Sequence, residues 1–114
     1  MKTILYHHTD CSKSCEVLSI LEEAHEDFTI IDYVNNPPSK ETLNSLITQL
    51  GITPENLVRK NEPLFKQEFD NKHYTNEQWI EILATHPILI ERPIVIKNGK
   101  ALIGRPPKSI LSIL

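Results

Sequence analysis

Residues 2–34, KTILYHHTDCSKSCEVLSILEEAHEDFTIIDYV, contain the pattern that decides the fold. The run KTILYHH mixes β-branched and aromatic residues and precedes polar TDCS, which predicts a strand followed by a loop. A second run of the same kind, FTIIDYV at residues 28–34, predicts another strand, and a strand, helix and strand of this length imply a right-handed parallel crossover. Apolar residues at helical spacing predict that the helix between them begins near Ser12: Val17, Leu18, Leu21 and Ala24.

A helical insertion is predicted over about residues 38–88. One helix there ends at Gly51, a residue suited to the left-handed position after a helix. A later helix begins with Thr75 and Gln78 in the spacing of a capping box, and Pro87 ends it. The first of these helices is indicated by apolar residues at helical spacing: Leu43, Leu46, Ile47 and Leu50.

The last quarter of the chain returns to β structure. Two β-rich runs in RPIVIKNGKALIGRPP, residues 92–107, are joined by Asn98-Gly99, which predicts a hairpin with type I′ geometry. A terminal helix over PPKSILSIL follows, with three residues at packing spacing: Ile110, Leu111 and Leu114. The order βαβ, helical insertion, ββα predicts an α/β, thioredoxin-like fold, in one domain over residues 1–114.

Composition limits the classes of function. The chain has 114 residues, 39% of them hydrophobic and 24% charged, which is ordinary for a globular domain. The net charge of −3 without a basic block argues against nucleic acid or a membrane surface as partner. No apolar run suits a signal peptide or a membrane span, so we expect a cytoplasmic protein, and we expect a monomer. In a reducing compartment, two neighbouring cysteines indicate redox or metal chemistry rather than a structural disulfide.

Cys11 is the candidate nucleophile. It lies at the predicted start of the first helix, where unpaired backbone N–H groups and the helix dipole favour a thiolate. His7, four residues earlier, would add a positive charge or a hydrogen bond, and the hydroxyl of Ser14 could donate to the same sulfur. The alternative is that Cys11 is an inert small hydrophobic residue.

The arginines give an independent signal. Of the 12 basic residues only three are arginines, and Arg59, Arg92 and Arg105 all fall in predicted loops or just before a strand. Lysine serves as an exposed charge, whereas the planar guanidinium suits bidentate recognition of an oxyanion. Pro93 follows Arg92 at the start of the third strand, where thioredoxin-like folds place a cis proline against the reactive cysteine. The alternative is that these arginines are ordinary solvated residues.

Four motifs in this order, YHHTDCSKS, LVRKNEP, THPILIERPIV and IGRPP, closely resemble the glutaredoxin-coupled arsenate reductase family over essentially the whole chain. The resemblance implies that Cys11 attacks arsenate, that His7 helps to ionise it, and that Ser14 matches the motif serine. It implies that three arginines bind the oxyanion: Arg59, Arg92 and Arg105. It also implies glutathione as cosubstrate, glutaredoxin as the protein that reduces the mixed disulfide, and no tightly bound cofactor.

Three features of the sequence depart from the pattern of this family. With them, the chain is more similar to a subgroup of shorter family members. Cys15 stands where many members have an arginine directly after the motif serine, and His8 and Thr9 replace the usual Asn and Pro. The loss of that arginine makes Cys11 less acidic than in those members. The sequence stops at Leu114, so we expect a protein without the C-terminal extension of longer arsenate reductases.

Cys15 has two readings that the sequence leaves open. It is either a small, partly buried residue of the helix or a resolving thiol that forms a strained, easily reduced disulfide with Cys11. No metal site is expected, because the helix constrains the two sulfurs and only Asp10 offers an outer carboxylate.

The sequence is also compatible with two functions other than arsenate reduction. One is a glutathione-linked thiol oxidoreductase without arsenate activity. The other is a redox-sensing regulatory adaptor of the Spx kind, which CSKS disfavours because Spx-type proteins usually carry a CxxC pair.

Overall fold

A computed structural model describes residues 3–8, 12–70 and 72–114 of the chain. The chain divides into two compact units. We call residues 1–36 with 92–114 the sheet unit and residues 37–91 the helical unit. No helix of the described ranges combines the length and the apolar character that crossing a bilayer requires.

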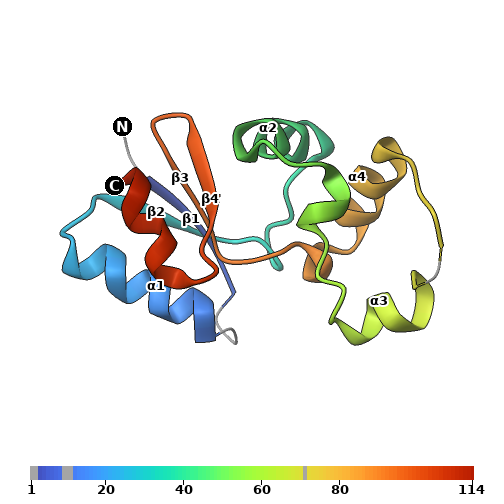
Figure 1. Ribbon diagram of the computed structural model, residues 1–114, viewed down its shortest axis with the longest axis horizontal. Coiled ribbons are helices and arrows are strands. Elements are labelled where there is room, and N and C mark those ends of the chain that lie inside the picture. Colours follow the sequence, from blue (N-terminus) through green and yellow to red (C-terminus); the bar gives the residue numbers. More distant parts are fainter. Residues whose placement is uncertain (1–2, 9–11, 71) are drawn as a thin grey trace. The chain divides into compact units, whose positions relative to one another are not determined.

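The sheet unit is built on one four-stranded sheet of order β2-β1-β3-β4 (Figure 1). The pairing of β1 with β2 is parallel, while β1 with β3 and β3 with β4 are antiparallel. This confirms the predicted βαβ and ββ segments and the thioredoxin-like α/β fold. The elements, in chain order, are β1 (Thr3–His7), α1 (Ser12–Glu23), β2 (Phe28–Asp32), β3 (Ile94–Lys97), β4 (Lys100–Ile103) and the 3₁₀ helix η3 (Pro107–Ile113).

Helix α1 and the C-terminal η3 lie side by side against the sheet (Figure 1). Their shared core is fully buried and consists of Leu5, Val17, Leu21, Val95 and Ile110. Two expectations about these helices were wrong. Ala24 follows α1 in a turn and is exposed. Leu111 is 54% exposed, because the terminal helix is 3₁₀, with three residues per turn, and so places Ile110 and Ile113 on one face.

The β3–β4 connection is the predicted two-residue hairpin. Asn98 has φ 52° and Gly99 has φ 77°, and a type I′ turn requires positive φ at both central residues. Lys97 pairs with Lys100 directly before and after the turn, so the register follows from the turn.

The helical unit contains the two helices predicted above, α2 and α4, and three shorter helical elements. Thr75 and Gln78 form both hydrogen bonds of a capping box at α4, and Gly51, at φ 70°, ends α2. The six-residue α3 was not expected, because it is too short to show helical periodicity. The elements are α2 (Lys40–Leu50), η1 (Pro54–Leu57), α3 (Pro63–Glu68), α4 (Asn76–Thr85) and η2 (Pro87–Leu89).

Gly104, directly after β4, lies where the chain passes close to α1. A Cβ atom at this position would be 2.7 Å from Cγ2 of Val17 and 3.0 Å from Cγ of Pro93. The N–H of Gly104 also donates to the carbonyl of Pro93 at 2.8 Å. The absence of a side chain therefore allows the end of β4, α1 and the start of β3 to pack together.

We expect Gly104→Ala to lower the free energy of unfolding by about 1–3 kcal/mol, the usual cost of overpacking a core. Urea unfolding measures this cost. The matched test is the double variant with Val17→Ala, which removes the nearest methyl group. The two losses should be less than additive, and strict additivity would show that the contact with Val17 is not the cause.

Candidate active site

One end of the sheet brings together segments that are distant in sequence. His7, the last residue of β1, pairs with Asp32, the last residue of β2. Ile94 opens β3 and pairs with Tyr6 on one side and with Ile103, the last residue of β4, on the other. The residues after β1, β2 and β4 and those before β3 therefore all leave the sheet at this end. They include four residues with polar side chains: His8, Tyr33, Arg92 and Arg105.

Cys11, the predicted nucleophile, lies outside the described residues, as do Thr9 and Asp10. Ser12, the next residue in the sequence, begins α1. Ser14 on the first turn of α1 is fully buried, and its hydroxyl oxygen accepts a hydrogen bond of 3.4 Å from the backbone N–H of His8. Because this bond uses the oxygen as acceptor, the hydroxyl hydrogen can still be donated to another group.

His7 is 5% exposed, and its Nδ1 is buried without a hydrogen-bond partner among the described residues. Burial lowers the pKa of His7 below its usual value, with Asp32 opposing this shift and His8 adding to it. The imidazole is therefore neutral at pH 7. Of the two roles predicted from the sequence, a hydrogen bond then fits His7 better than a positive charge.

The lowered pKa of His7 predicts a stability loss in acid. Below the unfolded-state pKa of about 6.5 the unfolded chain binds a proton that the folded protein still rejects, so folding is favoured less as pH falls. The loss stops growing below the folded-state pKa. We expect the urea midpoint to fall between pH 7 and pH 5 by more in the wild-type protein than in His7→Gln. Parallel pH profiles for the two proteins would contradict this assignment.

Arg92 is a buried cation in the sheet unit. Arg92 is only 7% exposed. Its Nη1 donates a hydrogen bond of 3.3 Å to Oη of Tyr33, and Tyr33 is fully buried. The Arg92–Pro93 peptide bond is cis. Burial and the hydrogen bond to Tyr33 restrict the directions that the guanidinium of Arg92 can take, so this side chain is held at the end of the sheet where the residues after β1 and β4 also lie.

Arg105 is exposed, but one atom of its guanidinium group is held by a hydrogen bond. Its Nε donates to the backbone carbonyl of Arg92 at 2.6 Å, and its own N–H donates to the carbonyl of Ile103 at 2.9 Å. The side chain of Arg105 is thus held against the main chain of Arg92. The structure brings these two predicted oxyanion ligands together.

Arg59, the third predicted ligand, belongs to the helical unit. Its Nη1 lies 2.9 Å from Oε1 of Glu91, and the two side chains are 17% and 24% exposed. The backbone supports this pair, since the N–H of Arg59 donates to Leu89 and that of Glu91 donates to Leu57, each at 2.7 Å. Sequence reasoning missed Glu91. Its only signal was its position beside Arg92 in the motif ERPIV.

Cys15 is exposed on the first turn of α1. Its role as a resolving thiol stays a prediction, because the other sulfur, on Cys11, lies outside the described residues. Within residues 3–8, 12–70 and 72–114, no cluster of three or more His, Cys, Asp or Glu side chains is placed to hold a metal ion.

The fold and the site place the chain among thioredoxin-like proteins. The structure of an arsenate reductase from Vibrio cholerae superposes with a TM-score of 0.94 and 39% identity, covering 100% of this chain and 98% of that one. An arsenate reductase of Haemophilus influenzae is 38% identical over the full length of both chains, and one of Neisseria meningitidis is 36% identical over 96% of each. The model of the ArsC family matches residues 6–113, and the chain belongs to this family.

Proposed function

We propose that this chain is an arsenate reductase, a thiol-dependent oxidoreductase that converts arsenate to arsenite through Cys11. Relatives named arsenate reductase share more than a third of the sequence over nearly the whole chain. The observation in the site that best supports the proposal is the guanidinium of Arg92, buried beside Tyr33, together with Arg105, whose Nε donates to the backbone carbonyl of Arg92. An arginine pair of this kind can take an oxyanion with little reorganisation.

The first step that we propose forms a sulfur–arsenic bond. The thiolate of Cys11 attacks arsenate, and one oxygen leaves as water after protonation. Three guanidiniums, those of Arg59, Arg92 and Arg105, offset the repulsion between the thiolate and the anion. Ser14 donates its hydroxyl hydrogen and His7 a hydrogen bond, and both stabilise the sulfur in its charged form.

The second step releases the product. Glutathione thiolate attacks the sulfur of Cys11, the sulfur–arsenic bond breaks with its electron pair on arsenic, and arsenite leaves. Arsenic is thereby reduced from As(V) to As(III), and two thiols are oxidised to a mixed disulfide. Glutaredoxin then reduces this disulfide by thiol exchange. We place the reaction in the cytoplasm, because glutathione keeps thiols reduced there.

The test is arsenate-dependent NADPH oxidation with glutathione, glutathione reductase and glutaredoxin present. Turnover that requires arsenate and all three components supports the proposal. Absence of arsenate-dependent turnover contradicts it. Thiol-disulfide exchange on a glutathionylated peptide without arsenate turnover would instead favour the glutathione-linked oxidoreductase. Tight binding of a partner protein that changes with oxidation would favour the Spx-like adaptor.

A further inference from the structure

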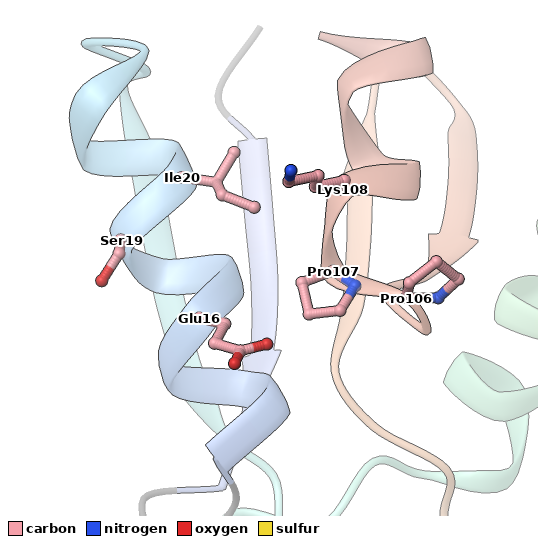
Figure 2. A pocket seen from close by; sticks show the side chains of 6 residues that line it. All are labelled: Glu16, Ser19, Ile20, Pro106, Pro107 and Lys108. Atoms are coloured by element: carbon pink, nitrogen blue, oxygen red, sulfur yellow. The ribbon is translucent and has the colours of Figure 1, made fainter.

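A groove in the sheet unit lies between α1 and the start of η3, and its role is not explained by oxyanion binding. Its volume is about 430 Å³, within the range of small-molecule sites. We call it the α1–η3 groove, and six residues line it: Glu16, Ser19, Ile20, Pro106, Pro107 and Lys108 (Figure 2).

Both walls of the groove begin with residues that follow proposed active-site residues in the sequence. Pro106 follows Arg105, whose Nε is held by the carbonyl of Arg92. On the other wall, Ser12 follows Cys11 in the sequence and begins α1, and Glu16 comes one turn later. Ile20 is eight residues beyond Ser12, which corresponds to about 12 Å along the helix axis. A molecule in the groove would therefore extend along α1 away from the position in the chain that carries the nucleophile.

The chemistry of the lining is mixed. Pro106, Pro107 and Ile20 supply apolar surface, while the carboxylate of Glu16 and the ammonium of Lys108 point from opposite walls into the space between α1 and η3 (Figure 2). Oε2 of Glu16 lies 3.9 Å from Nζ of Lys13, a loose ion pair between side chains that are both about half exposed. Such a pair is weak, so the carboxylate can turn to a ligand at little cost.

We propose that the α1–η3 groove binds glutathione, the thiol that attacks the arsenylated cysteine; this inference rests on the proposed function. Glutathione carries an ammonium group, two carboxylates and two peptide groups on a short apolar frame. Its ammonium pairs with Glu16 and one carboxylate pairs with Lys108. The hydroxyl of Ser19 hydrogen-bonds a peptide group, and the methylene groups pack on the two prolines and Ile20. In this arrangement the γ-glutamyl end of glutathione lies nearest the start of α1, because Glu16 is the first lining residue of that helix.

The binding experiment does not depend on arsenate. S-methylglutathione, which has no free thiol, is titrated into ¹⁵N-labelled protein and followed by NMR. We expect saturable shifts at the amides of Ser19, Ile20 and Lys108. Lys108→Ala and Glu16→Gln should each weaken binding about fivefold, the upper range for a partly exposed ion pair. Lys100→Ala, an exposed lysine on β4 outside the groove, is the matched control and should leave binding unchanged.

A second ligand sharpens the assignment of Glu16. N-acetyl-S-methylcysteinylglycine lacks the γ-glutamyl residue and carries no ammonium group, so it should bind more weakly and its affinity should not respond to Glu16→Gln. An equal response of both ligands would overturn the proposed pairing.

Measurement of KM for glutathione in the arsenate assay distinguishes failure of this inference from failure of the proposed function. If arsenate is reduced, Lys108→Ala should raise KM for glutathione about fivefold while Lys100→Ala does not. Turnover with an unchanged glutathione KM and no shifts in the groove overturns the inference and leaves the proposed function intact. Shifts in the groove without arsenate turnover support the inference and overturn the proposed function. Shifts that follow protein concentration, or that arise only with glutaredoxin, identify a second copy or a protein surface as the occupant and overturn the glutathione assignment.

Discussion

Cys11→Ser should abolish arsenate-dependent turnover, with a fall of at least about 1,000-fold in the coupled NADPH assay, as is usual when a covalent nucleophile is removed. A serine hydroxyl is far less acidic than a thiol, so it offers almost no anion at pH 7. It also cannot form the mixed disulfide through which electrons reach arsenic.

The matched control is Cys15→Ser. Cys15 is the other cysteine of the chain and is exposed on α1. If glutathione resolves the arsenylated cysteine, Cys15→Ser should keep at least half of the wild-type activity. Loss of activity in both variants would assign the resolving step to Cys15 and remove glutathione from it. Full activity in Cys11→Ser would contradict the proposed nucleophile.

Arg92→Lys should lower kcat/KM for arsenate by about 100-fold, in the range found when one preorganised donor to a developing anion is removed. Lysine keeps the positive charge but loses the planar fork. It also replaces the separate nitrogens of the guanidinium with one, so a single atom would have to reach both Tyr33 and the substrate. Steady-state kinetics with arsenate as the varied substrate measures the effect.

Tyr33→Phe separates positioning from binding. It removes the hydroxyl that accepts from Nη1 of Arg92 but leaves the guanidinium in place. We expect a loss of about tenfold, mostly in KM, since a hydrogen bond to a charged group contributes about 1.5–3 kcal/mol. Arg92→Lys kinetics identical to wild type would show that the fork of Arg92 takes no part in catalysis.

Features that depend on neighbouring residues could be predicted from the sequence. The capping box at Thr75, the left-handed Gly51 and the Asn98-Gly99 hairpin each use an interaction within a few residues, so local pattern was sufficient. The burial of Leu111 was predicted wrongly because the pattern was read with the period of an α-helix, whereas η3 has the period of a 3₁₀ helix.

Contacts between distant residues could not be read from local pattern. The Arg59–Glu91 pair spans 32 residues, and the bond from Arg105 to the carbonyl of Arg92 spans 13. The tight approach of Gly104 to Val17 depends on the packing of β4 against α1. The candidate arginines were found because their residue type and position before proline were unusual. Their partners Glu91 and Tyr33 were not found, because a single glutamate or tyrosine in a sequence carries no such signal.

The β3–β4 hairpin has a practical use. Asn98 and Gly99 are both exposed, and the four residues of β3 separate Asn98 from Pro93, a distance of about 16 Å along an extended strand. A fluorophore or a surface tether attached at Asn98 would therefore be at the opposite end of β3 from Arg92 and would not contact the site residues there. The protein could in this way be immobilised as an electrode-bound sensor for oxyanions in water.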